Sequence, residues 1–164
     1  MYDAAMTPNP YAKDLGDREP IAAMKDAVDR IQAIAATWTP AQFERSYAPG
    51  KWSARQIFTH LAQTELALGN RARMALATPN YAAQAFDQDL WMVRESKLGG
   101  PEAVAALVAC NAMNRSLFAS LSPTDKQAAF THPEYGGLNV DWVIHQMAGH
   151  VRHHLEQIET IAKK

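Results

Sequence analysis

Hydrophobic residues recur at steps of three and four along four long segments of the chain, and short polar stretches with proline or glycine separate these segments. Such spacing places apolar side chains on one face of a helix. In the first segment this face contains Ile21, Met24, Val28, Ile31 and Ile34. In the third segment it contains Val104, Leu107, Val108, Met113, Leu117 and Leu121. The four segments predict helices over residues 19–37, 53–77, 99–121 and 139–163.

The connections between these segments carry signals for helix starts and chain breaks. Thr39-Pro40-Ala41-Gln42 and Ser122-Pro123-Thr124-Asp125 each combine a capping residue with proline at the first helical position, which predicts a short helix. Another short helix is expected near residues 86–93, within a longer crossover. Proline and glycine predict a loop over residues 131–139, and no segment alternates over the length of a strand.

These patterns predict an all-α fold, a four-helix bundle with short extra helices in its connections. Residues 1–18, which Pro8 and Pro10 interrupt, are predicted to form a loosely ordered lead-in segment. Residues 19–164 are predicted to form a single domain, because a chain of 164 residues has no room for a second full one.

Composition narrows the classes of protein to consider. The chain is 48% hydrophobic, which is typical of globular proteins, and no apolar run approaches the length of a membrane span. A net charge of -1 provides no basic face for nucleic acid, so we expect neither a membrane nor a nucleic-acid partner. The N-terminus lacks the pattern of a signal peptide, which favours a cytoplasmic location. A single cysteine, Cys110, excludes an intramolecular disulfide.

Histidine placement is the unusual feature of the sequence, because five of the six histidines lie in the last third of the chain. His150 and His154 are one helical turn apart and fall on the apolar face of the last predicted helix. His60 falls on the apolar face of the helix over residues 53–77. Buried imidazoles cost free energy unless their nitrogens are satisfied, and one metal ion would satisfy all three. Three protein ligands would leave a fourth position open, as in catalytic zinc sites.

Other roles for these histidines compete with a metal site. A single inward histidine is usually a core residue that hydrogen-bonds to the backbone, and histidine pairs of this spacing also occur on solvated faces. A zinc protease motif is excluded because Val151 stands where the catalytic glutamate would be. A di-iron bundle is excluded because no glutamate in the chain is followed by histidine three positions later. Three histidines on the inward faces of two helices favour the metal.

The chain resembles the DinB/YfiT-like family of four-helix-bundle metalloenzymes. The motifs that carry the resemblance are Lys51-Trp52-Ser53 followed by His60-Leu61, the crossover from Phe86 to Trp91, His132-Pro133-Glu134, and the segment from His150 to Ile158. The family's metal ligands are one histidine early in the second helix and two spaced by four in the last helix. The resemblance therefore implies His60, His150 and His154 as ligands, and zinc or nickel as the metal.

The resemblance also implies the kind of chemistry. Members of this family look like S-transferases that use low-molecular-weight thiols such as bacillithiol, or like a mycothiol-dependent isomerase, and others are described as metal-dependent hydrolases. We expect first a metal-dependent transferase that uses such a thiol and a small-molecule substrate. A hydrolase in which the metal activates water is the second hypothesis, and a non-catalytic bundle stabilised by metal is the third. Similar proteins are often homodimers.

Four further residues are candidates for a substrate pocket. Asp87 and Trp91 lie in the crossover, while Arg71 and Arg115 interrupt the apolar faces of their helices. Either arginine would suit an anionic substrate, although an inner salt bridge is the simpler explanation and the one that we favour. For Asp87 the alternative is a solvated helix start, and for Trp91 it is ordinary packing.

Overall fold

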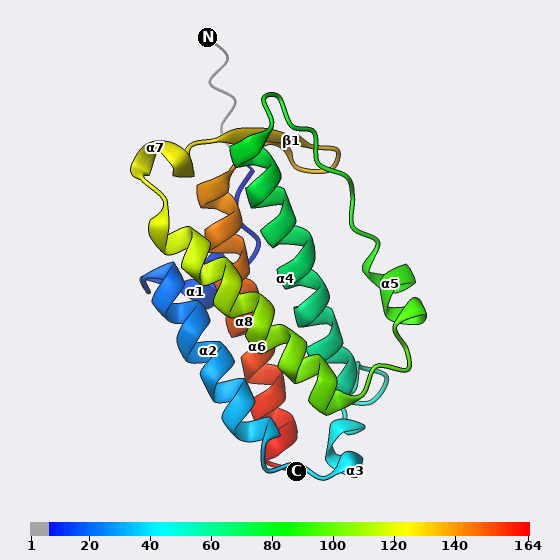
Figure 1. Cartoon of the computed structure of the whole chain (residues 1–164). Helices are drawn as coiled ribbons and strands as arrows, with labels where there is room; N and C mark the ends of the chain where they lie inside the picture. Colours follow the sequence, from blue (N-terminus) through cyan, green and yellow to red (C-terminus); the bar gives the residue numbers. More distant parts are fainter. Residues whose placement is uncertain (1–6) are drawn as a thin grey trace.

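A computed structural model describes residues 7–164 and contains four long helices within that range (Figure 1). They are α2 (Pro20–Ala35), α4 (Ala54–Ala77), α6 (Gly100–Ser120) and α8 (Val140–Ala162). Each begins and ends within two residues of the predicted range. The predicted four-helix bundle is therefore confirmed, together with the short helices α3 (Pro40–Phe43), α5 (Gln88–Arg94) and α7 (Pro123–Lys126) in its connections.

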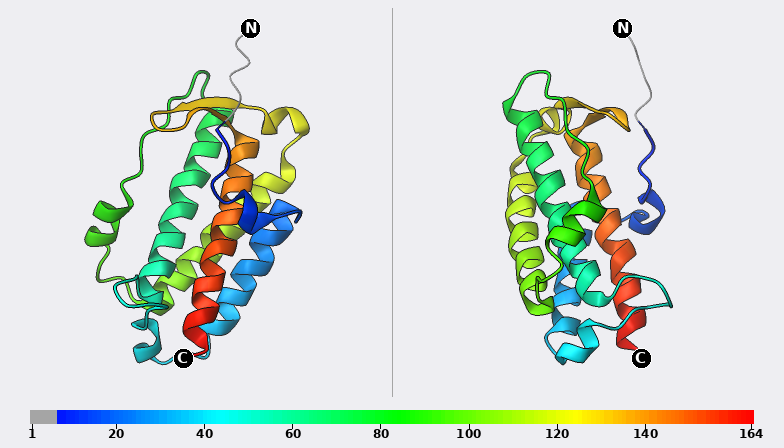
Figure 2. Two further views of the ribbon diagram at one scale, coloured as in Figure 1. Left: turned by 180° about the vertical axis from the view of Figure 1, so that it is seen from behind. Right: turned by 90° about the vertical axis from the view of Figure 1, so that its right-hand side faces the viewer.

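The four long helices enclose one hydrophobic core. Helix α4 packs against α6 and α8, and α2 packs against the other side of both (Figure 2). Fully buried side chains from all four helices fill the centre, among them Met24, Ile31, Ile57, Leu107, Ile144 and Ile158. Within residues 7–164, no helix is both long enough and apolar enough to cross a bilayer.

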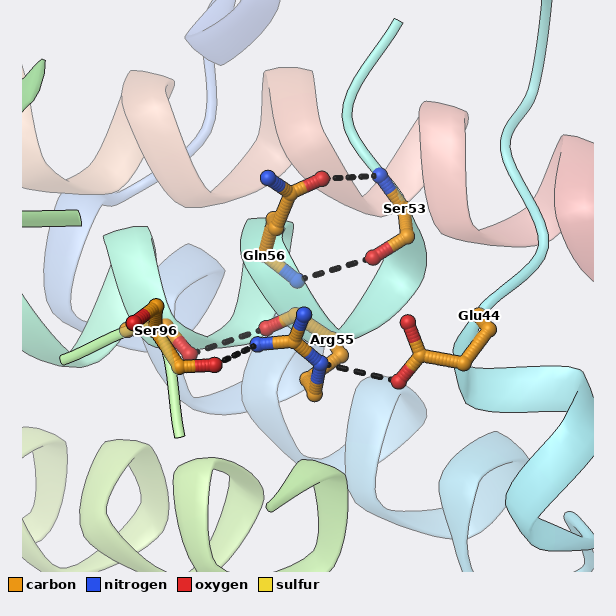
Figure 3. Close-up of polar contacts among 6 residues, drawn as sticks. Glu44, Ser53, Arg55, Gln56 and Ser96 are labelled. Atoms are coloured by element: carbon orange, nitrogen blue, oxygen red, sulfur yellow. Dashed lines mark hydrogen bonds and ion pairs between the residues drawn. The ribbon is translucent and has the colours of Figure 1, made fainter. Parts of the chain in front are cut away.

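The start of α4 is held by a capping box (Figure 3). The backbone N–H of Ser53 donates to the side chain of Gln56 at 2.9 Å, and the backbone N–H of Gln56 donates back to the Ser53 hydroxyl at 3.4 Å. Arg55 donates to the carboxylate of Glu44 and to the carbonyl of Ser96, at 2.8 and 3.0 Å. The capping box satisfies the backbone N–H of Gln56 in the first turn of α4, and Arg55 ties this turn to two connections. His60 follows in the next turn of the same helix.

The predicted loop over residues 131–139 is wrong, because most of this segment forms a hairpin at one end of the bundle. Strand β1 (Ala129–His132) pairs antiparallel with β2 (Gly136–Asn139). Four residues are too few for a clear alternation of apolar and polar side chains, and the glycines of β2 hide its strand character. The hairpin also meets the crossover, through a bridge between Thr131 and Ala82.

The N-terminal segment packs against the bundle. Within the predicted lead-in, residues 1–6 lie outside the described part of the chain, and the rest includes a short helix, α1 (Ala12–Leu15), that lies on α8 (Figure 2). The indole N–H of Trp142 donates to the carbonyl of Thr7 at 2.8 Å. Gly149 allows this approach, since a Cβ atom there would collide with the backbone of Tyr11.

The inward face of α6 differs from the predicted one. Met113 was expected on the apolar face but is 56% exposed. Asn111 and Asn114 are buried instead, and both donate to the carboxylate of Glu65 on α4, at 2.9 and 2.7 Å. Burial raises the pKa of Glu65, while these hydrogen bonds act in the opposite direction. A polar network therefore occupies part of the contact between α4 and α6.

Candidate metal centre

Three histidine side chains converge inside the bundle between α4 and α8. The Nε2 atom of His150 lies 3.0 Å from Nε2 of His60 and 3.1 Å from Nε2 of His154. All three side chains are buried, and one nitrogen of each lies within 4.8 Å of the others. The predicted helical faces therefore bring together the three histidines that the sequence pattern indicates, from positions 90 residues apart.

Burial keeps these imidazoles neutral. Desolvation is the main cause that lowers the pKa of His60 to about 3 and that of His154 to about 4, and the pKa of His150 is lowered well below its usual value. Repulsion from a charge on His154 also lowers the pKa of His60 and of His150. A neutral imidazole is the form that binds a metal ion, so the cluster can accept one near neutral pH without first losing protons.

A chain of polar side chains orients His154. Its Nδ1 atom lies 2.8 Å from the side-chain oxygen of Gln157, and the amide nitrogen of Gln157 lies 3.2 Å from Nε2 of His153. His153 in turn places Nδ1 3.1 Å from the carboxylate of Asp14 on α1. Partners of this kind fix which ring nitrogen of a ligand carries the proton. Here the proton of His154 lies on Nδ1, and its Nε2 lone pair faces the cluster.

Hydrogen bonds between neutral rings do not satisfy this arrangement. If Nε2 of His150 carries a proton, that proton fills only one of its two short contacts well. If it carries none, its lone pair faces the lone pair of His154 at 3.1 Å. The first case leaves one short N···N contact without a good hydrogen bond, and the second places two lone pairs face to face. A cation bound between the rings would remove both problems. Two nitrogens bound to one tetrahedral zinc lie about 3.3 Å apart, close to the spacing here.

A cavity of about 350 Å³ opens beside the cluster, with His60 and His150 in its wall. Aromatic side chains line part of it, and charged or polar groups from α4 and the β1–β2 hairpin line the rest. The remaining wall includes Tyr11, Arg71, Phe86, His132, Glu134 and Trp142. The volume suits a small organic molecule, and such a molecule would contact the histidines directly.

The four pocket candidates occupy different places. Arg71 lines the cavity beside the histidines. Trp91 lines a neighbouring cavity of about 560 Å³, which shares Arg71 and Phe86 with the first. Asp87 caps α5 by accepting from the backbone N–H of Leu90 at 2.9 Å. Arg115 donates to Asn111 at 2.8 Å and so belongs to the polar network around Glu65. Neither Asp87 nor Arg115 lines the cavity beside the histidines.

Sequence reasoning missed several residues around the cluster. Tyr11 packs edge-on against the ring of His150, with centroids 5.0 Å apart, although its segment was expected to be loosely ordered. His132 was assigned to a loop, yet it is buried and lines the cavity. Gln157 had a signal in the sequence that was not used, since it follows His154 by three positions on a helix.

Comparison with known proteins agrees with this geometry. The family model of the DinB superfamily matches residues 23–158. The chain belongs to this superfamily. A relative from Oceanobacillus iheyensis, "Putative metal-dependent hydrolase OB0782", is 30% identical over 124 residues, which cover 75% of this chain and 72% of the relative. The shared family and the three-histidine cluster support a divalent metal in this DinB protein.

Two solved structures share the fold. YfiT from Bacillus subtilis, described as a probable metal-dependent hydrolase with an unusual four-helix bundle topology, aligns with a TM-score of 0.80 at 18% identity, over 99% of this chain and 91% of YfiT. A mycothiol-dependent maleylpyruvate isomerase aligns with a TM-score of 0.71 at 14% identity, over 89% of this chain and 62% of the isomerase. At such identities the likeness concerns the fold alone.

Proposed function

We propose that this protein is a metal-dependent enzyme in which His60, His150 and His154 hold one divalent ion, zinc or nickel. The observation that carries the proposal is the convergence of three buried Nε2 atoms whose short contacts hydrogen bonds cannot all satisfy. A structural site is usually closed by a fourth protein ligand, whereas this cluster has three and adjoins a cavity.

The residues of the chain prepare the site for chemistry. Burial keeps the three imidazoles neutral, and Gln157 aligns His154. When bound, a divalent metal supplies Lewis-acid chemistry at the coordination position that the protein leaves open. The aromatic wall formed by Tyr11, Phe86 and Trp142 excludes water around a bound molecule and holds its apolar part. The substrate is therefore a small molecule.

Hydrolysis is the reaction that we place first. The Oceanobacillus relative is named as a hydrolase, and Glu134 provides the one carboxylate among the described residues that line the cavity. A carboxylate in this wall can accept a proton from water during its attack on an ester or amide. Transfer to a low-molecular-weight thiol is the second candidate, and the thiol-dependent isomerase that shares the fold supports it.

Turnover assays separate these reactions. Protein loaded with zinc or nickel is tested on a simple ester without thiol, and on a simple electrophile with and without low-molecular-weight thiols. Hydrolysis independent of thiol supports the first candidate, and turnover that requires thiol supports the second. In either case His154→Ala abolishes activity, while His145→Ala, which lies nine residues earlier on α8 and outside the cluster, retains it. No turnover under any condition would favour a metal that only stabilises the bundle.

Other expectations stay predictions from the sequence. They are the single domain over residues 19–164, the cytoplasmic location and the lack of a nucleic-acid partner. The homodimer that the family resemblance implies is also untested, and the sequence itself leaves the oligomeric state open. Size-exclusion chromatography with light scattering would test the homodimer.

A further inference from the structure

Arg71 is a buried cation with few partners. It lies on α4 eleven residues after His60, on the same face, and is only 9% exposed. A guanidinium has five N–H donors. Among residues 7–164, however, Arg71 makes one hydrogen bond, from Nη2 to the carbonyl of Gln84 at 2.8 Å, and no ion pair. The salt bridge that would explain this arginine structurally is therefore missing from the described part of the chain.

His132, at the end of β1, presents a second unsatisfied donor. The residue is 4% exposed, and its Nδ1 atom accepts from the backbone N–H of Glu134 at 3.2 Å. An Nδ1 atom that accepts carries no proton, so the proton of the neutral ring lies on Nε2. That Nε2 atom is buried and has no hydrogen-bond partner within residues 7–164. A buried donor without an acceptor costs free energy, which a ligand could recover.

Both residues line the cavity whose wall also includes His60 and His150. Burial is the main cause that lowers the pKa of His132, and the positive charge of Arg71 is the second. The two side chains are therefore close together. Glu134 acts in the opposite direction and lines the same cavity, although its carboxylate forms no ion pair with Arg71. Tyr11 and Tyr135 are the other titratable groups in this wall besides the metal-centre histidines. For an incoming anion, the wall therefore offers the positive charge of Arg71 and the neutral N–H of His132, and only the carboxylate of Glu134 would repel it.

We propose that the guanidinium of Arg71 and the Nε2–H of His132 form an oxyanion subsite, which binds a carboxylate or phosphate group of the substrate. The planar fork of an arginine matches both groups. An anion held there would lie in the same cavity as His60 and His150 and would direct the rest of the molecule toward them. The subsite stands on these two residues alone, whereas its assignment to the substrate rests on the proposed function.

The test is binding of two probes, inorganic phosphate and acetate, to the full chain labelled with ¹⁵N-histidine. Each probe is titrated while the Nε2–H resonance of His132 is followed by NMR, with the signal assigned from His132→Phe. Either probe, or both, should shift this resonance, and the one that binds tighter identifies the anionic group. Arg71→Gln should weaken binding by about 10- to 100-fold. The affinity of Arg71→Lys should lie between those of the wild type and Arg71→Gln.

Two control variants sharpen the result. Arg73→Gln removes the same charge two positions away, but Arg73 donates to Gly69 and Asn114 and does not line this cavity, so binding should be unchanged. Glu134→Gln removes the opposing carboxylate and should strengthen binding. Failure of both probes to shift His132, or equal affinity in Arg71→Gln and the wild type, would overturn the subsite.

The titrations are repeated on EDTA-dialysed protein and on His154→Ala. Binding that depends on Arg71 and persists in both supports the subsite, whatever the outcome of the metal analysis. Binding that ignores Arg71 and disappears in both comes from an anion on the metal, which overturns the subsite but supports the metal centre. Binding that depends on Arg71 in a wild-type protein unable to hold metal supports the subsite and contradicts the proposed function.

Discussion

The side-chain oxygen of Gln157 lies 2.8 Å from Nδ1 of His154, three positions earlier on α8. This contact assigns the ring proton to Nδ1 and turns the Nε2 lone pair toward His150. Because Gln157 also contacts His153, and His153 contacts Asp14, the orientation of a proposed ligand is linked to the N-terminal segment. Residues outside the cluster should therefore influence metal affinity.

Gln157→Ala is expected to weaken metal binding by about 10- to 100-fold, because it removes the acceptor that orients His154. Gln157→Glu keeps an acceptor and should retain affinity close to that of the wild type. Competition with a chromogenic chelator measures these affinities. Gln32→Ala, an exposed change on α2, is the control. Equal affinities for Gln157→Ala and the wild type would show that His154 needs no such partner.

The metal-free protein should become less stable as the pH falls below about 6.5. In the unfolded chain, His60 and His154 take up protons near the ordinary histidine pKa of 6.5, whereas in the fold their pKa values are about 3 and about 4. The unfolded state therefore binds more protons in this window, and the free energy of unfolding decreases with decreasing pH. Urea denaturation of EDTA-dialysed protein between about pH 5 and 8 measures the slope.

The variant His154→Phe tests the origin of that slope. It removes one of the buried imidazoles that gain protons on unfolding, so its free energy of unfolding should change less with pH than that of the wild type. Identical slopes for the two proteins would mean that other groups cause the loss of stability.

Met113 tests the predicted inward face of α6, and Met24 on α2 is the buried comparison. Met24 on α2 is fully buried, and Met24→Ala should cost about 2–5 kcal/mol in the free energy of unfolding. Met113 on α6 is 56% exposed, and Met113→Ala should change stability by no more than about 0.5 kcal/mol. Urea denaturation compares them. A large cost at Met113 would mean that the apolar face predicted from the sequence packs in the core after all.

The helical faces were predictable because each apolar stripe is long. The stripe of α8 continues through Val143, Met147, Ile158 and Ile161, so the phase of His150 and His154 was determined by their neighbours. The same holds for His60 between Ile57 and Leu61 on α4. These residues are buried in the structure, and this is why the histidine cluster could be predicted from the sequence.

Other features depend on contacts that periodicity does not encode. Asn111 and Asn114 face the core only because Glu65 on another helix accepts their hydrogen bonds, so a pattern of apolar residues selects Met113 instead. The burial of His132 follows from a hairpin of very short strands. Tyr11 reaches His150 because Gly149 leaves room for its backbone. The first and the last of these are relationships between segments far apart in the sequence, and the hairpin depends on strands too short to show a pattern.

Metal content tests the central claim most directly. Untagged protein is dialysed against zinc or nickel, then against buffer, and analysed by inductively coupled plasma mass spectrometry. We predict about one divalent ion per chain in the wild type and in His145→Ala. His60→Ala, His150→Ala and His154→Ala should each lose that ion while circular dichroism confirms that they remain helical. A wild-type protein without bound metal, or triad variants with unchanged stoichiometry, would contradict the proposed metal centre.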